Sequence, residues 1–339
     1  MDSRIASSEE GRDATRPSQF RWRDWKAVLL RVYDNVFRHN LFLIAAGVAF
    51  YAILALFPAI AALFALYGLV ANAADIAQQL DTMRRFLPPD AYSLIETQVR
   101  ELTEAGEQKL GLASIIATLF ALWSARAGVY GMVTGLNVAY SEHDERSTVA
   151  GILLSLALTG VLLVVVIAAI LAIVVLPAVL QTIELDDQAA WIMAIVRWPI
   201  MLAALMFGIG MLYRYGPDRR QARVQWISWG SVIATAVWLL GSLLFSFYVS
   251  NFADYNATYG SLGAIVGLLM WFFVGAFIVL LGAELNAEIE HQTLRDTTVG
   301  PDRPMGQRGA FVADHKPGEG DEDRREGIPE TEDDRVGRA

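Results

Sequence analysis

The 339-residue chain contains no cysteine, and charged residues make up only 19% of it. Without cysteine, the protein has no disulfide bridges, no thiolate metal ligands and no thiol chemistry. Soluble globular proteins have about 25% charged and about 45–50% apolar residues, whereas this chain is 55% hydrophobic. The composition therefore excludes a disordered chain and a disulfide-stabilised secreted domain, and it does not fit a soluble globular protein.

Long uncharged hydrophobic stretches dominate the sequence instead. A membrane-spanning helix needs about 20 consecutive apolar residues, and six stretches of the chain reach that length. We therefore predict an all-α polytopic membrane protein, a bundle of six transmembrane helices. The predicted spans are residues 41–71, 110–140, 149–180, 189–213, 226–250 and 260–285.

The first span and the loop after it have features of their own. Residues 41–71 form an uncharged run longer than a straight span needs. Pro58 predicts a helix kink within this run, because proline removes a backbone donor. In the following loop, apolar residues recur at helical spacing on both sides of Pro88 and Pro89. We expect two short amphipathic helices in this first external loop, with a plain linker as the less favoured alternative.

The distribution of Lys and Arg predicts the orientation of the chain. Most of the membrane-proximal Lys and Arg lie on the side that holds both termini, so the positive-inside rule places the termini in the cytoplasm. The chain then divides into a cytoplasmic segment (1–24), the six-helix domain (25–290) and an acidic tail (291–339) that we expect to be disordered. The basic strip Arg219–Arg223 is expected to contact anionic lipid headgroups rather than nucleic acid.

Arg126 is a charged residue inside the second predicted span. It lies about 24 Å along the helix from Leu110, at about 1.5 Å per residue, where an arginine costs at least about 2.5–3.5 kcal/mol unless it is paired or hydrated. One interpretation is a site for an anion or lipid headgroup, or half of a gating ion pair. The other is a structural pair or a side chain that snorkels to the surface. Glu284, near the end of the sixth span, is the predicted partner, unless it already lies in water.

Other polar and small residues complete the picture of the membrane domain. Polar groups inside a span must find partners or water, and the GxxxG motif allows close helix approach. The predicted intramembrane polar site comprises Arg126, Glu284, Asn137, Tyr51 and Tyr259. The glycines predicted to pack helices together are Gly131 and Gly135 in the second span and Gly263 and Gly267 in the sixth.

Sequence motifs for catalysis are missing. The chain has no HExxH, no glycine-rich phosphate loop and no G-x-S-x-G elbow, and none of its histidines lies deep within a span. Glu284, Glu288 and His291 share a helical face, but hydrated charges at a helix exit are favoured over a metal site there. We expect no catalytic residues, no metal and no cofactor.

Three sequence blocks carry a resemblance to a known family. They are residues 45–58 (AAGVAFYAILALFP), Arg126 with residues 136–146, and residues 255–286. Together they cover the chain from about residue 25 to 290 and resemble the YihY/BrkB family of bacterial inner-membrane proteins, which carries the legacy label ribonuclease BN. The resemblance implies a six-helix protein of the bacterial inner membrane with cytoplasmic termini, and it implies no accepted activity.

Two functional hypotheses follow for this chain. The first is a transporter or exporter for a lipid or an anionic amphiphile, with Arg126 in or beside the path. The second is a non-transporting scaffold or envelope assembly factor in which Arg126 and Glu284 form a structural pair. RNA cleavage is least favoured, because it calls for a metal cluster or a positioned acid–base pair. Membrane lipids and further copies of the chain are the expected partners, and nucleic acid is not.

Overall fold

The structure is a computed structural model that describes residues 13–70, 107–170, 187–251 and 263–317. Within these ranges the regular elements are helices, and the one β-bridge joins Ala222 to Thr298. The all-α prediction is confirmed for this part of the chain. The helices are η1 (Pro17–Gln19), α1 (Trp22–Arg38), α2 (Leu41–Val70), α5 (Glu107–Ala139), α6 (Thr148–Ile170), α8 (Asp187–Tyr215), α9 (Val224–Asn251), α11 (Gly263–His291) and α12 (Phe311–Asp314).

The long helices follow the predicted hydrophobic stretches closely. Four described helices are long and apolar enough to cross a membrane, namely α6, α8, α9 and α11. A fifth span results if the bent pair α1 and α2 is taken as one. The structure therefore supports a multi-pass membrane protein with four or five such spans, and the count of six stays a prediction.

Helix α1 was not predicted from the sequence. Val28, Val32 and Val36 recur every fourth residue and are buried, so α1 has one apolar face. It meets α2 at an angle of 62°. Asn40 lies at the break with φ of 51°, a left-handed conformation that asparagine tolerates better than most residues. Helix α2 itself continues through Pro58.

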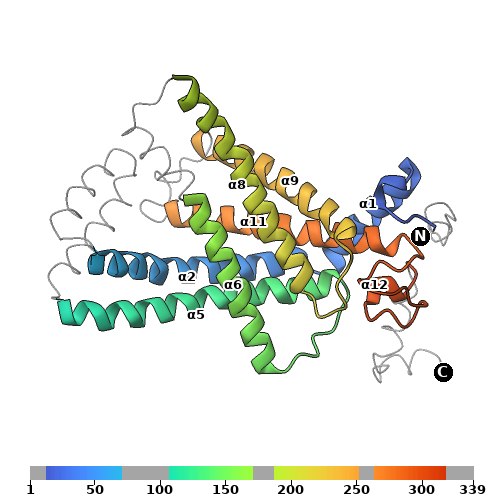
Figure 1. Ribbon diagram of the computed structural model, residues 1–339, viewed down its shortest axis with the longest axis horizontal. Helices are drawn as coiled ribbons and strands as arrows, with labels where there is room; N and C mark the ends of the chain where they lie inside the picture. Colours follow the sequence, from blue (N-terminus) through green and yellow to red (C-terminus); the bar gives the residue numbers. More distant parts are fainter. Residues whose placement is uncertain (1–12, 71–106, 171–186, 252–262, 318–339) are drawn as a thin grey trace, which may run out of the picture.

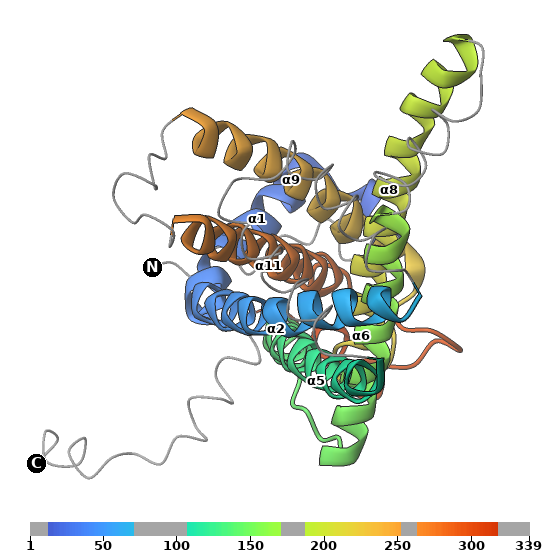
Figure 2. The same ribbon diagram turned by 90° about the vertical axis from the view of Figure 1, so that its left-hand side faces the viewer.

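Helices α2, α5 and α11 run along the long axis of the molecule, and α6 and α8 cross them obliquely (Figures 1 and 2). A stripe of glycines lets α5 approach α2. A Cβ on Gly131 would lie 3.4 Å from Val48, and one on Gly135 would lie 2.8 Å from Ile44 and 2.6 Å from Leu280 of α11. Gly135 therefore lies where three helices meet, and any side chain there must displace its neighbours.

The second glycine pair behaves differently. Gly263 is buried at the start of α11, but a Cβ on Gly267 would meet no atom of the described structure within 4 Å. Closer contacts of α11 occur further along. Gly282 lies against Tyr213 of α8, and Gly230 of α9 lies against the side chain of Asn286. The tight packing of α11 is therefore near its C-terminal end.

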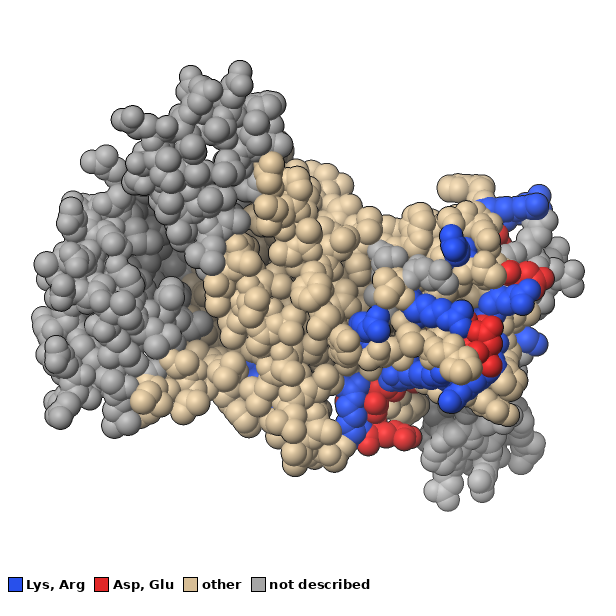
Figure 3. Space-filling view, in the orientation of Figure 1, with Lys and Arg blue, Asp and Glu red and all other residues tan. Residues whose placement is uncertain are grey.

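Charged side chains gather at one end of the molecule (Figure 3). We call this region the polar end. It consists of α1, the last turns of α11, the loops 140–147 and 216–223, and the segment 292–317. Over the rest of the bundle many large apolar side chains are exposed, for example Leu119, Val164 and Leu243. Such an exposed apolar surface is expected of helices that face lipid.

The segment 292–317 corrects the prediction of a disordered tail from residue 291 onward. Thr297, Thr298 and Val312 are buried, and the Thr298 backbone bridges to Ala222. The Arg308 side chain donates hydrogen bonds to the carbonyls of Leu294 and Ala313. The polar composition of the segment suggested disorder, but its charged groups find partners on the bundle and on one another. The remaining tail, residues 318–339, lies outside the described residues.

Candidate functional site

Arg126 lies in the middle of the bundle, between α5 and α6. Its guanidinium group lies 4.5 Å from the ring centroid of Trp123 and 5.9 Å from that of Tyr130. Its closest polar partner is the Ser155 hydroxyl, which accepts a hydrogen bond from Nη1 at 3.4 Å. The buried Nε has no partner, and none of the described carboxylates forms an ion pair with this side chain. Arg126 is therefore a cation held by aromatic faces and one hydroxyl.

Glu284 has other partners than the one predicted. One carboxylate oxygen lies 3.0 Å from Nδ1 of His39, and the other accepts a hydrogen bond of 2.8 Å from the Asn35 amide. Gly135 of α5 lies against Leu280 of α11. Arg126 lies nine residues before Gly135 on α5, and Glu284 lies four residues after Leu280 on α11. At about 1.5 Å per residue, this separates the two side chains by about 20 Å along the bundle. The predicted Arg126–Glu284 pair is therefore not formed.

Glu284 belongs to a series of polar contacts between α1 and α11, which we call the polar ladder. It pairs Arg31 and Asn35 of α1, and His39 directly after α1, with Glu284 and Glu288 of α11 and Gln292 directly after α11. Asn35 also donates to Glu288 at 2.8 Å, and Arg31 binds both Glu288 and, at 2.9 Å, Gln292. Each set is spaced four residues apart, so all three side chains of a helix lie on one face. The ladder joins α1 to α11 through charge-assisted hydrogen bonds.

A second buried ion pair lies on the other side of α11. Arg219 donates to Glu290 at 2.6 Å, and both side chains are almost fully buried. The Thr297 hydroxyl donates to the same carboxylate at 2.9 Å, and the Arg219 guanidinium lies 4.9 Å from the ring centroid of Tyr140. This pair connects the loop after α8, the end of α11 and the segment 292–317.

The basic strip around Arg219 is therefore less available to lipid than predicted. Arg219 is committed to Glu290, and Arg223 pairs with Asp302 and donates to the Thr298 carbonyl. The acceptor of Arg219 belongs to α11, and the segment 292–317 supplies the acceptors of Arg223. Arg223 therefore helps to hold that segment in place.

Two carboxylates in these loops have shifted pKa values. Burial raises the pKa of Glu142 above its ordinary value, although its carboxylate accepts a hydrogen bond from the Phe311 amide. For Asp296, burial acts in the same direction, but hydrogen bonds from Thr298 and from the Arg303 amide outweigh it and lower the pKa. Both groups tie the segment 292–317 into the structure.

The remaining residues of the predicted polar site are dispersed. Asn137 is buried, and its Oδ1 accepts a hydrogen bond of 2.7 Å from the Asp218 amide, so it holds the loop after α8. Tyr51 is 40% exposed and lies against Gly128 of α5. Tyr259 and the predicted amphipathic helices of the first external loop lie outside the described residues. Arg126, Glu284 and Asn137 thus have separate settings rather than one common site.

Among the described residues, no group of three His, Asp or Glu side chains is arranged to hold a metal ion. Glu284 and Glu288 lie together, but their oxygens are occupied by Arg31, Asn35 and His39. This arrangement fixes the two helices to one another.

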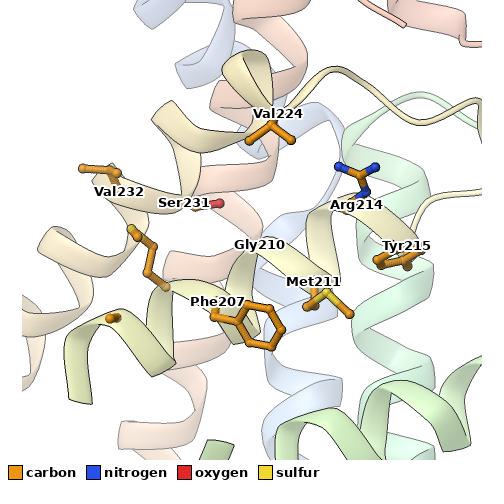
Figure 4. A pocket seen from close by; sticks show the side chains of 10 residues that line it. Phe207, Gly210, Met211, Arg214, Tyr215, Val224, Ser231 and Val232 are labelled. Atoms are coloured by element: carbon orange, nitrogen blue, oxygen red, sulfur yellow. The ribbon is translucent and has the colours of Figure 1, made fainter. Parts of the chain in front are cut away.

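An apolar cavity of about 490 Å³ lies between α8 and α9. Its lining is almost entirely hydrophobic, and Arg214 is the only charged side chain in it (Figure 4). The Arg214 guanidinium lies 5.7 Å from the ring centroid of Tyr215, and its buried Nε has no hydrogen-bond partner. In the sequence, Arg214 is one of the membrane-proximal positive charges that predict the orientation of the chain. The lining residues are Ala203, Met206, Phe207, Gly210, Met211, Arg214, Tyr215, Val224, Ser231 and Val232.

Apolar helices with a charged end define a helical multi-pass membrane protein. A family described as virulence factor BrkB matches residues 32–305 of the chain. The chain therefore belongs to the BrkB family, and the predicted resemblance is confirmed. The match extends past α11 into the segment 292–317, as expected if that segment is part of the fold.

Individual relatives carry general names. The chain is 30% identical over 247 residues to the ribonuclease-like protein YfkH of Bacillus subtilis, covering 72% of this chain and 88% of the relative. It is 26% identical over 255 residues to a UPF0761 membrane protein of Chlorobium luteolum, covering 74% of this chain and 57% of the relative. A UPF0761 membrane protein of Idiomarina loihiensis is 31% identical over 110 residues, which is 32% of this chain and 38% of the relative. No solved structure matches the chain.

Proposed function

We propose that this protein is a transporter- or exporter-like protein of the bacterial inner membrane that handles a lipid or an anionic amphiphile. The observation that carries the proposal is the environment of Arg126, a cation in mid-bundle without a carboxylate partner. An arginine in the membrane costs at least about 2.5–3.5 kcal/mol unless its charge is compensated. A passing phosphate or carboxylate would supply that compensation.

The surroundings of Arg126 favour an amphiphile over a small ion. Trp123 and Tyr130 hold the guanidinium and are themselves about half exposed. An exposed aromatic pair beside a cation offers apolar contact for a hydrocarbon chain and charge for its headgroup. The Arg126–Glu284 ion pair, which was one version of the structural interpretation, is not formed, so the functional interpretation competes with a side chain that snorkels to the surface.

In this proposal the polar end lies in the cytoplasm together with both termini. The support is the excess of Lys and Arg at that end and the positive-inside rule. We further propose that the protein acts without covalent catalysis and does not bind nucleic acid. The name ribonuclease-like belongs to the Bacillus subtilis relative, and its chemistry would need a metal cluster or acid–base pair.

The second candidate is a membrane scaffold or assembly factor. It is favoured by the polar ladder, which fixes α1 to α11 and gives the polar end a rigid surface. A scaffold needs such a surface and needs no conducting path. The two candidates differ in what they require of Arg126.

Flux through the purified protein in proteoliposomes tests the first candidate. Fluorescent phospholipids, small anions and protons form the panel, and wild type is compared with Arg126→Gln. Wild-type flux that falls at least about tenfold in the variant is expected, since this is the effect of losing about 1.4 kcal/mol of interaction. Lys26→Gln removes the same charge from an exposed position at the polar end and should keep full flux. Flux that survives in Arg126→Gln would remove Arg126 from the mechanism, and a protein inactive across the panel would favour the scaffold.

A further inference from the structure

The cavity between α8 and α9 has the dimensions and lining of a ligand site. Its volume of about 490 Å³ falls within the range of about 300–1,000 Å³ typical of small-molecule pockets. Phe207, Met206 and Met211 supply apolar surface, and methionine adapts to irregular chains. Since a lining of this kind gains little from a polar ligand, its occupant must present hydrocarbon.

The position of Arg214 gives the cavity a polar mouth. Arg214 and Tyr215 end the apolar stretch Trp198–Tyr215 of α8, which places them at the membrane boundary, where lipid phosphates lie. Ala203 lines the same cavity eleven residues earlier, about 16 Å deeper in the membrane at about 1.5 Å per residue. The cavity thus runs from the depth of a headgroup to the depth of acyl chains.

The charge of the site selects the headgroup. Arg214 is the only charged side chain among the ten that line the cavity, and its buried Nε has no hydrogen-bond partner. None of the described carboxylates forms an ion pair with it. Guanidinium groups bind phosphate through charge-assisted hydrogen bonds, so an anionic group at the mouth would satisfy a donor that the protein leaves unpaired.

We propose that the α8–α9 cavity binds one anionic phospholipid, with its phosphate at Arg214 and an acyl chain along Met211, Phe207 and Ala203. Gly210 and Ser231 form the seam between the two helices at the middle of the cavity, and a Cβ on Gly210 would lie 3.7 Å from the Ser231 hydroxyl. A lipid held there would bridge α8 and α9. The site is separate from Arg126, and its occupancy does not depend on whether the protein transports anything.

The test is lipid binding to the full-length purified protein, measured by native mass spectrometry with phosphatidylglycerol and phosphatidylcholine as probes. Wild type should prefer phosphatidylglycerol, and Arg214→Gln should bind it about tenfold more weakly, as expected for the loss of one charge-assisted contact. Arg214→Lys keeps the charge and should retain most of the preference. Lys26→Gln and Arg126→Gln should bind as wild type does, so failure of the transport proposal leaves this result unaffected.

The hydrocarbon part of the proposal has its own variant. Gly210→Leu fills the seam without a clash at Cβ and should weaken the binding of both lipids. Equal binding of the two lipids by wild type, full phosphatidylglycerol binding by Arg214→Gln, or unchanged binding by Gly210→Leu would each overturn the proposal. A protein that binds neither lipid would also overturn the proposal. If a second copy of the chain covers this face instead, cysteines introduced at Val232 should crosslink the two copies.

Discussion

Two regions of the molecule treat their charges in opposite ways. At the polar end, Arg31 and Arg219 each bind a buried glutamate and gain further hydrogen bonds. Along the apolar bundle, Arg126 and Arg214 contact aromatic rings and leave buried Nε groups without partners. Arg219 also has a buried nitrogen without a partner, Nη1, so the regions differ in the carboxylate that compensates the charge at the polar end. Arg126 and Arg214 lack such a carboxylate among the described residues and could bind an anion from outside the chain. Charge compensation therefore separates structural arginines from candidate functional ones better than depth in the membrane does.

The largest expected effect comes from breaking the buried pair at the polar end. Glu290→Ala leaves Arg219 buried without its carboxylate, which costs about 3–5 kcal/mol. The exposed pair of Arg295 and Asp13, 3.5 Å apart, serves as the control, because exposed pairs contribute only about 0–1 kcal/mol. Thermal unfolding in detergent should show a large loss for Glu290→Ala and little change for Arg295→Ala. Equal losses in the two variants would contradict the distinction between the regions.

A smaller effect is expected from the glycines that pack the bundle. Gly135→Ala places a methyl group against Ile44 and Leu280, and overpacking of this kind typically costs about 1–3 kcal/mol. A Cβ on Gly267 meets no atom of the described residues within 4 Å, so Gly267→Ala should gain up to about 1 kcal/mol from helix propensity. Opposite shifts of the unfolding midpoint are therefore predicted. A loss of stability in Gly267→Ala would show that α11 is tightly packed there as well.

The smallest expected effect concerns pH at the segment 292–317. The pKa of Asp296 is lowered below its ordinary 3.8 in the folded protein, so this group stabilises the fold above pH 3.8 and loses that contribution as the pH falls through its folded pKa. The pKa of Glu142 is raised above its ordinary 4.5 in the folded protein. This group therefore stabilises the fold at low pH and loses that contribution as the pH rises through its folded pKa.

Asp296→Asn separates the two contributions. The difference in unfolding midpoint between wild type and this variant should be largest at pH 7 and should shrink as the pH is lowered below 3.8. Glu142 is present in both proteins and cancels in the difference. A gap that stays constant with pH would mean that the Asp296 carboxylate does not stabilise the segment through its charge.

The sequence was a good guide to the helices and a poor guide to their contacts. Uncharged runs of sufficient length define helices locally, and α2, α5, α6, α8, α9 and α11 follow the predicted stretches. Contacts between residues far apart in the chain have no such local signal. Glu284 was predicted to pair with Arg126 because both are charged residues predicted to lie toward the same membrane face. The packing of Gly135 against Leu280 instead separates the two side chains along the bundle.

The polar ladder did leave a trace in the sequence. Arg31, Asn35 and His39 repeat every fourth residue, as do Glu284 and Glu288, and two complementary stripes of this kind predict neighbouring helices. The signal was missed because residues 25–40 were not recognised as a helix. Disorder was wrongly predicted for residues 292–317 because their burial depends on acceptors and donors on the bundle, which composition alone does not show.

The polar ladder also has a consequence for the synthesis of the protein. It joins Arg31 to Glu288 across 257 positions, so the half on α1 leaves the ribosome long before the half on α11. Domains and segments fold in order of synthesis, and α1 must wait for α11 before its polar side chains are satisfied. A chain that stops before Glu284 presents Arg31, Asn35 and His39 without acceptors. A chain truncated before α11 therefore lacks the hydrogen bonds that hold α1 against the bundle.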